Sequence, residues 1–275
     1  MIKDIVVSLG LGTQDPAGTY AISVAEKFEA HLLGIAVSYE PIIPGTVMGG
    51  VPPDIIEDQR AESDKRADAA IARFEQAAKR AGISNESRLI TASVAGAADQ
   101  IGRIARRFDL AVVGQPARRP SLPDQVVDEG VLFESGRPVI FVPFVQTSGI
   151  KLDRIMVCWD GSRTAGRAVA DAMPLLKEAK QVEIVIVSGK PAKDDELPGA
   201  DLGQHLARHG LNVGIKRITS PDTDVPSTIL SYAADSSADM IVMGGYGHSR
   251  LRQFILGGVT RGMLESMTVP VLMSH

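Results

Sequence analysis

The chain repeats one succession of short motifs, in the same order, in its two halves. "IVVSLG" from residue 5 resembles "IMVCWDG" from residue 155, "IGRIARRFDLAVVG" (101–114) resembles "LSYAADSSADMIVMG" (230–244), and "RPVIFV" (137–142) resembles "VPVLM" (269–273). Each pair is weak alone, but the shared order indicates an internal duplication. The sequence therefore predicts two similar domains, residues 1–145 and 151–275, joined by the polar stretch "VQTSGIK" (145–151).

Apolar runs alternate with helical patterns in both halves. In the second half, five runs predict strands at 155–158, 182–188, 212–218, 240–244 and 270–273, with helical spacing between them. The first half adds a Pro/Gly-rich insertion at 40–53 and a long amphipathic helix from about Asp54 to Ala81. Such alternation predicts the α/β class: two Rossmann-like domains, each a five-stranded parallel sheet with helices on both faces.

Composition and charge exclude several classes of protein. The net charge is −4, so no broad basic surface for nucleic acid is expected. The single cysteine, Cys158, cannot form an internal disulfide. No apolar stretch approaches the roughly 20 residues of a membrane helix, and the apolar run at the N-terminus is too short for a signal peptide. We expect a soluble, cytoplasmic protein without a membrane partner.

A glycine-rich stretch near the C-terminus is the main candidate for a binding site. "IVMGGYGHSRLRQFILGGVTRGML" (241–264) has five glycines between Gly244 and Gly258, spaced Gly-x2-Gly-x9-Gly-Gly. It leaves the carboxyl end of a predicted strand, where ligands bind in open α/β sheets, and enters a helix whose N-terminus attracts anions. A phosphate chain could be held at both ends of the loop, and Arg250 and Arg252 could add charge. The alternative is a solvated loop with two tight turns and a helix cap.

This spacing resembles the nucleotide-binding pattern of the universal stress protein family. "MVCWDGS", "ADMIVMGGYGH" and "VPVLM" support the resemblance, which covers nearly the whole chain except residues 40–53. The chain resembles a tandem member of the family. The resemblance implies an adenine nucleotide alpha hydrolase-like fold, binding of ATP or AMP that Mg²⁺ could accompany, and a stress-response or regulatory role. It also implies an intramolecular pseudo-dimer that mimics the family's homodimers, while a homodimer of whole chains stays open.

The resemblance assigns roles to particular residues. Asp160 matches an acidic residue near the base and ribose, although "DGS" is also a common turn sequence. Val187 matches a position that meets adenine through its backbone, although it could be a core valine. The full set of nucleotide-binding positions that the resemblance implies is Trp159, Asp160, Val187, Met243, Gly244, Gly247, His248, Gly257, Gly258, Val259 and Thr260.

The chain departs from the family pattern in both halves. Gly258 stands where the family has Ser or Thr, which removes a phosphate hydrogen bond worth roughly 1.5–3 kcal/mol, although Thr260 could partly substitute. The first half has Leu9 and Gly10 in place of the acid. It keeps Gly114 but lacks the second glycine and the closing pair, and its loop has prolines at 116, 120 and 123, which remove donors. We therefore expect one nucleotide per chain, in the second half, with the first half structural or binding something else.

Other chemistry has weaker support. His205 and His209 have a metal-ligand spacing but no evident third ligand. "GYGH" (245–248) has one histidine of a nucleotidyl transferase His-x-Gly-His motif, and Cys158 is expected to be a buried structural thiol.

Three functions therefore remain, in descending order. They are an adenine nucleotide-binding regulator, a nucleotide-free protein-interaction module, and a slow ATPase for which no catalytic base is evident. The sequence identifies neither the protein partner nor which adenine nucleotide would bind.

Overall fold

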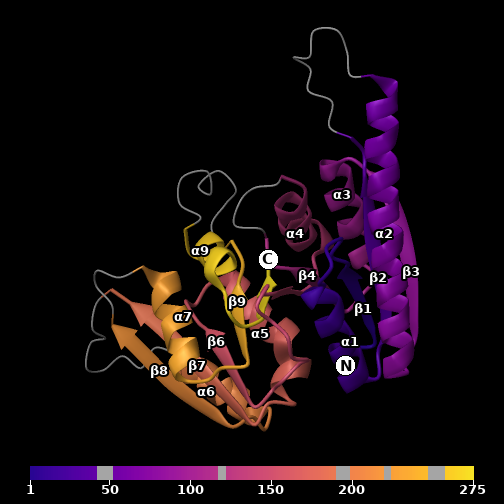
Figure 1. Ribbon diagram of the computed structural model, residues 1–275. Helices are drawn as coiled ribbons and strands as arrows, with labels where there is room; N and C mark the ends of the chain where they lie inside the picture. The colour runs from indigo at the N-terminus through magenta and orange to yellow at the C-terminus, as the bar shows by residue number, and fades with distance from the viewer. Residues whose placement is uncertain (42–51, 117–121, 190–198, 220–223, 247–257) are drawn as a thin grey trace. The chain divides into compact units, whose positions relative to one another are not determined.

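The chain forms two compact units, Ile2–Ser135 and Gly136–His275 together with Met1. The computed structural model describes residues 1–41, 52–116, 122–189, 199–219, 224–246 and 258–275 (Figure 1). We call the two units the N-terminal unit and the C-terminal unit. Across the described ranges, every helix is too short or too polar to span a membrane.

The N-terminal unit has a parallel sheet in the order β3-β2-β1-β4. Residues Ile5 of β1, Leu32 of β2 and Leu110 of β4 lie side by side in this sheet. The strands are β1 (Asp4–Ser8), β2 (His31–Tyr39), β3 (Asn85–Ala92) and β4 (Leu110–Gly114), and the helices are α1 (Pro16–Phe28), α2 (Pro53–Ala81), α3 (Val94–Ala105) and α4 (Leu122–Ser135).

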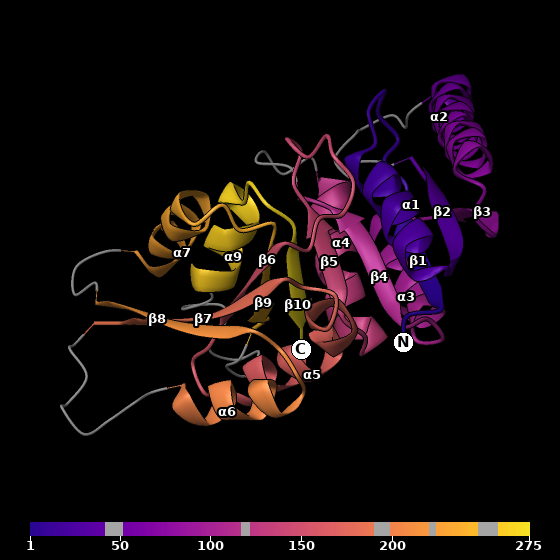
Figure 2. The same ribbon diagram turned by 90° about the horizontal axis from the view of Figure 1, so that it is seen from below.

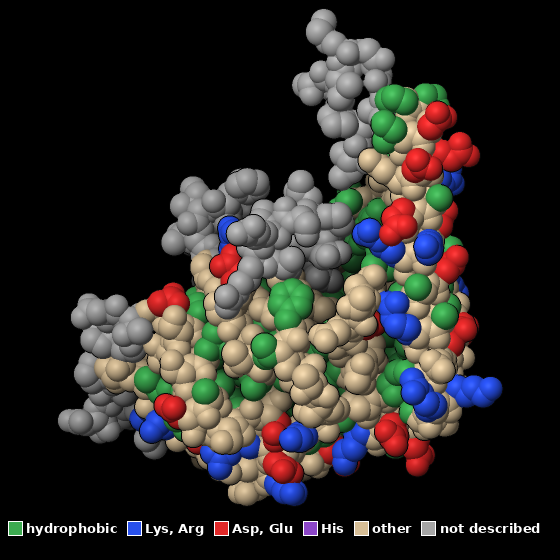
Figure 3. Space-filling view, in the orientation of Figure 1, with side chains coloured by type: hydrophobic (Ala, Val, Ile, Leu, Met, Phe, Trp, Pro, Cys, Tyr) green, Lys and Arg blue, Asp and Glu red, His purple; other side chains and the backbone are tan. Residues whose placement is uncertain are grey.

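Helix α2 confirms the predicted long amphipathic helix. It begins at Pro53, a residue suited to a first turn, and ends at Ala81, and the following Gly82, whose backbone is left-handed (φ 68°), caps the last turn. Its buried residues are Ala67, Ala70, Phe74 and Ala78, a stripe with helical spacing. Acidic and basic side chains cover its exposed face (Figure 3). The second half of α2 therefore anchors it to the unit, and its first half is mostly exposed.

The C-terminal unit has a mixed sheet in the order β5-β10-β9-β6-β7-β8. Figure 2 shows α7 and α9 on one face of this sheet and α5 and α6 on the other. The strands are β5 (Val139–Val142), β6 (Arg154–Cys158), β7 (Gln181–Ser188), β8 (Val213–Thr219), β9 (Met240–Gly244) and β10 (Val271–Ser274), and the helices are α5 (Arg163–Leu176), α6 (Ala200–Arg208), α7 (Val225–Asp235) and α9 (Gly258–Ser266).

Strand β5 pairs with β10 and is antiparallel to it, with Phe141 opposite Val271 and Val139 opposite Met273. All four residues of β5 are buried, as are all four of β10. The last strands that the sequence predicts for the two halves are thus neighbours in one sheet, which covers apolar edges that would otherwise promote aggregation. The packing of the two halves as a pseudo-dimer stays a prediction. The units divide the chain at 135/136, whereas the sequence places the first domain's end at residue 145. Because β5 lies in the C-terminal unit, the described strands form a four-stranded parallel and a six-stranded mixed arrangement, not the two five-stranded parallel sheets that the sequence predicts.

Candidate functional site

The order in which the chain adds strands to the C-terminal sheet reverses between β6 and β9. β7 and β8 follow on one side of β6, whereas β9 lies on its other side, parallel to it. Val157 of β6 pairs with Val242 of β9, so the residues that follow both strands emerge at one edge of the sheet. A reversal of strand order creates a crevice at the carboxyl ends of parallel strands, and ligands bind in such crevices.

Asp160 lies directly beyond β6 and forms a tight turn before α5. Its Oδ1 accepts a hydrogen bond from the Ser162 backbone N–H over 2.9 Å. The Ser162 hydroxyl oxygen in turn accepts from the Ala165 N–H over 3.1 Å and so caps α5. The Asp160 side chain is exposed, so its carboxylate is accessible to a ligand from the crevice. The turn role of Asp160 is shown, and its role in binding stays a prediction.

The thiol of Cys158 is unsuited to nucleophilic chemistry. Burial raises its pKa from 9.0 to about 12, and the neighbouring Asp160 carboxylate adds to the rise. Because the thiolate is the reactive form, a thiol with this pKa is almost entirely protonated near neutral pH. Cys158 is only partly buried, so the raised pKa supports an unreactive thiol but not the fully buried one expected from the sequence.

Gly244 is required by close packing. A Cβ atom at this position would lie 2.6 Å from both the Ala165 backbone nitrogen and the Thr164 Oγ1. The first turn of α5 therefore rests directly on the end of β9, and any side chain at Gly244 would force the two apart. This contact alone explains why a glycine is needed at position 244, and no bound ligand has to be invoked. The sequence pattern could not show this.

The two sides of the glycine-rich stretch are joined by hydrogen bonds. The Gly245 N–H donates to the Ser274 carbonyl over 2.8 Å, which extends the β9–β10 pairing. The Tyr246 N–H donates to the Thr260 Oγ1 over 3.2 Å. Thr260 is only 6% exposed, so its hydroxyl lies inside the unit. The Thr260 hydroxyl oxygen therefore links the two sides of the stretch. Because it already accepts this hydrogen bond, it is less available for the predicted role as a substitute phosphate ligand.

Gly258 begins helix α9 and is exposed. No described atom lies within 4 Å of a Cβ built at this position, and its φ is outside the left-handed region. A serine is therefore sterically acceptable there. Val259 is 40% exposed in the same first turn. The predicted positions Gly247, His248, Gly257, Arg250 and Arg252 lie outside the described residues.

The remaining predicted positions lie at the strand ends. The Trp159 N–H donates to the Val185 carbonyl over 2.9 Å, which continues the pairing of β6 with β7. Val187 lies near the carboxyl end of β7, partly buried and paired with Ile218. Met243 is 5% exposed, so its side chain belongs to the core and only its backbone could meet a ligand.

The histidine pair does not form a metal site with other described groups. The rings of His205 and His209 are 4.8 Å apart at their centroids, at an edge-to-face angle. Within the described ranges, no three His, Cys, Asp or Glu side chains gather where they could hold a metal ion.

The N-terminal unit has an acidic residue, Asp15, shortly after β1, although the matching of the two halves in sequence finds no counterpart of Asp160 there. Asp15 lies beyond β1 and caps α1, where its Oδ1 accepts from the Gly18 N–H over 2.9 Å. Burial raises the pKa of Asp15, although hydrogen bonds from the Gly18 and Gly10 N–H groups and the Arg73 charge act in the opposite direction. The following Pro16 is the signal that could have revealed this cap. Asp15 serves the helix and the β1 loop.

Comparison with known proteins agrees with this geometry. Residues 151–275 match the model of the universal stress protein family. The C-terminal region is a universal stress protein domain. Universal stress protein Slr1230 from Synechocystis sp. is 24% identical, over 44% of this chain and 42% of its own. The chain thus matches less than half the length of that relative.

Solved structures extend the similarity of fold to nearly the whole chain. A universal stress protein from Archaeoglobus fulgidus aligns with a TM-score of 0.74 and 20% identity, over 98% of this chain and 95% of its own. A functionally unknown protein from Pseudomonas aeruginosa PAO1 aligns with a TM-score of 0.61 and 14% identity, over 99% and 92%. These alignments confirm the Rossmann-like α/β fold. A tandem origin of the two halves stays a prediction.

Proposed function

We propose that the protein has a stress-response or regulatory role and that its C-terminal unit binds one adenine nucleotide. The reversal of strand order between β6 and β9 is the observation that carries this proposal. Asp160 follows one of these strands and Gly244 the other. Helix α9 then begins at Gly258, on the far side of the glycine-rich stretch. The family of the C-terminal region makes a nucleotide the preferred ligand for this crevice.

Each group has a defined chemical part in the proposed complex. The exposed Asp160 carboxylate accepts a hydrogen bond from the adenine amino group or from a ribose hydroxyl. The first N–H groups of α9, beginning at Gly258, have no partners within the helix and carry a partial positive charge, so they receive phosphate oxygens. The backbone at Val187 meets the adenine edge. Mg²⁺ could accompany ATP and neutralise part of its charge.

Calorimetric titration with ATP, ADP, AMP and cyclic AMP tests the proposal. We expect one nucleotide per chain. Asp160→Ala should weaken binding by about 1–3 kcal/mol, because a hydrogen bond to a charged group is lost. Asp153→Ala is the matched control, since this acid is exposed and precedes the same strand at its opposite end. Binding unchanged in Asp160→Ala, or two equivalent nucleotides per chain, would contradict the proposed site.

A nucleotide-free interaction module is the second candidate. Two observations favour it: the packing of Thr164 accounts for Gly244 without a ligand, and Gly258 lacks the hydroxyl of the family pattern. Nucleotide analysis of the purified protein and the titration above separate the two candidates. A slow ATPase ranks last, and phosphate release at the rate of the buffer control would eliminate it.

A further inference from the structure

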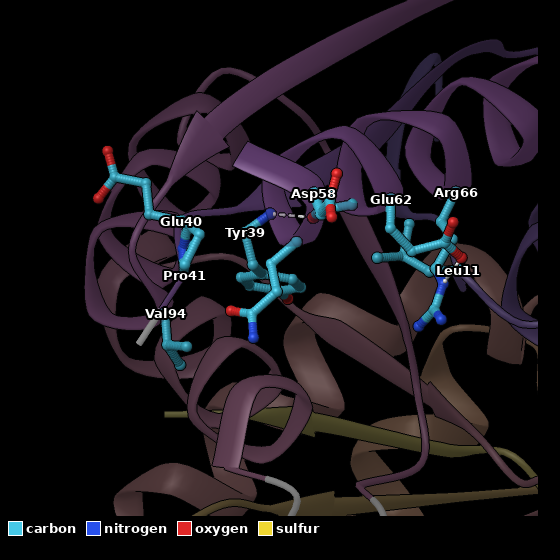
Figure 4. Close-up of a pocket in the computed structure, with 10 residues that line it drawn as sticks. Leu11, Tyr39, Glu40, Pro41, Asp58, Glu62, Arg66 and Val94 are labelled. Atoms are coloured by element: carbon cyan, nitrogen blue, oxygen red, sulfur yellow. Dashed lines mark hydrogen bonds and ion pairs between the residues drawn. The ribbon is translucent and has the colours of Figure 1, made fainter. Parts of the chain in front are cut away.

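The N-terminal unit contains a pocket of about 490 Å³ at the carboxyl end of its sheet (Figure 4). This volume is within the range of about 300–1,000 Å³ that is typical of small-molecule sites. Residues from the β1 loop, the end of β2, the first half of α2 and the start of α3 line it. They are Leu11, Tyr39, Glu40, Pro41, Asp58, Gln59, Glu62, Ser63, Arg66 and Val94.

Hydrogen bonds from Arg73 of α2 hold the β1 side of the pocket in place. Its Nη2 donates to the Gly12 carbonyl over 2.7 Å and to the Gly10 carbonyl over 3.4 Å. Leu11, which lines the pocket, lies between these two glycines. The Leu9 N–H also donates to the Ile35 carbonyl over 2.8 Å and so ties the loop to β2. The wall that Leu11 contributes is therefore fixed before any ligand arrives.

The end of β2 is tied to α2 in the same way. The Tyr39 N–H donates to the Ser63 hydroxyl oxygen over 2.8 Å, and the buried Ser38 hydroxyl donates to an Asp64 carboxylate oxygen. Tyr39 and Ser63 both line the pocket. Three separate segments are thus bonded to one another around a single space, which reduces the ordering cost of binding.

The residues that line the pocket include both apolar side chains and carboxylates. Leu11, Tyr39, Pro41 and Val94 supply apolar surface, whereas Glu40, Asp58 and Glu62 supply carboxylates. Arg66 is the one cation among the described lining residues, and its Nε lies 2.9 Å from the Glu62 Oε1. Figure 4 shows the Glu40 carboxylate directed away from Tyr39. Asp58 is therefore the principal uncompensated charge, and a phosphate would be repelled there.

We propose that this pocket binds a small organic cation, an ammonium or amidinium group on a compact apolar body. The apolar body would pack against the Tyr39 ring, which lies between Leu11 and Val94 in Figure 4, and the cation would lie near the Asp58 carboxylate, which attracts positive charge. The site is separate from the crevice of the C-terminal unit and does not depend on nucleotide binding. The proposed ligand of the N-terminal unit is therefore positively charged, whereas a nucleotide is negatively charged.

Three probes with the same ring and different charge test this proposal on the full chain. They are benzamidine (cation), benzyl alcohol (neutral) and benzoate (anion), each titrated by ligand-observed NMR. We expect saturable benzamidine binding with one site per chain, weaker binding of benzyl alcohol and none of benzoate. Raising the salt from about 0.05 to 0.5 M should weaken benzamidine binding, because exposed charges are screened. Benzoate binding as tightly as benzamidine, or no benzamidine binding, would overturn the proposal.

Variants on the surface of α2 locate the binding. Asp58→Asn should weaken benzamidine binding by about twofold to fivefold, the range for a partly exposed charge pair. Asp54→Asn, on the same helix but outside the lining, should leave it unchanged. Gln59→Trp should fill the space and remove binding of benzamidine and benzyl alcohol alike; because Gln59 is exposed, the fold should tolerate the change. Unchanged benzamidine binding in Gln59→Trp would place the ligand elsewhere and refute the site.

Discussion

The Tyr246 backbone N–H donates a hydrogen bond to the Thr260 hydroxyl oxygen over 3.2 Å. Tyr246 has φ 49°, a left-handed conformation that a residue with a Cβ rarely adopts. The bond helps to hold this conformation, which costs about 1–2 kcal/mol relative to the right-handed form. The exit from β9 and the first turn of α9 are thus fixed to each other, independently of any ligand.

Replacing Thr260 should show the value of this bond. Thr260→Val keeps the shape but removes the acceptor and leaves the Tyr246 N–H without this partner. We expect a loss of about 1–3 kcal/mol in the free energy of unfolding, measured with urea. Thr260→Ser retains the oxygen and should lose less. Equal stability of wild type and Thr260→Val would show that the bond has no net value.

A second prediction concerns the hydroxyl missing at Gly258. Gly258→Ser should tighten ATP binding by about 1 kcal/mol, as expected for one added hydrogen bond to phosphate. The site can accept the change, because no described atom lies within 4 Å of the new Cβ. Gly258→Ala is the control that adds the Cβ without the hydroxyl. Weaker ATP binding by Gly258→Ser in calorimetry would show that the loop has diverged from the family's phosphate contacts.

An added methyl group at Gly244 should destabilise the fold, whereas the one at Gly258 is sterically acceptable. Gly244→Ala places a Cβ 2.6 Å from the Ala165 nitrogen, so β9 and α5 must separate. We expect a destabilisation of about 1–3 kcal/mol by urea unfolding, the usual cost of overpacking. Gly258→Ala serves again as the comparison and should be close to neutral. If both variants were equally stable, the close approach of α5 to β9 would be wrong.

The sequence predicts those parts of the fold that depend on local pattern. Helix α2 was predictable because its apolar residues recur with helical spacing and Gly82 follows it. The antiparallel direction of β5 was not, because "VIFV" has no feature that selects a parallel or an antiparallel partner. Its place in the C-terminal unit follows from pairing with β10, a contact between residues distant in sequence.

The candidate site was predictable in outline, from glycine spacing and the strand ends. The structural use of Gly244 was not, since it depends on how closely Thr164 approaches. The bracing role of Thr260 was missed for the same reason. The pocket of the N-terminal unit has no sequence motif at all, because its lining comes from separate segments that only the fold brings together.

The last prediction concerns Cys158 and uses its neighbour Asp160. With a pKa of about 12 instead of 9.0, the native thiol should carry about 1,000-fold less thiolate at pH 8 than the unfolded chain. Alkylation by iodoacetamide, followed by mass spectrometry, should therefore be very slow in the native protein, rise with pH, and become fast in urea. Asp160→Asn removes a negative charge that disfavours the thiolate, so it should lower the pKa and speed native alkylation at any given pH.

Stability must be measured in parallel, because a less stable variant would expose Cys158 more often. Asp153→Asn is the control for an exposed acid at the other end of β6 and should leave the alkylation rate unchanged. Burial is the larger cause of the raised pKa, so Asp160→Asn should retain most of the protection. Native alkylation as fast as in urea would show that the thiol is accessible and ionisable. The same rate in wild type and Asp160→Asn would show that the carboxylate does not act on the end of β6, and would weaken its proposed position at the nucleotide.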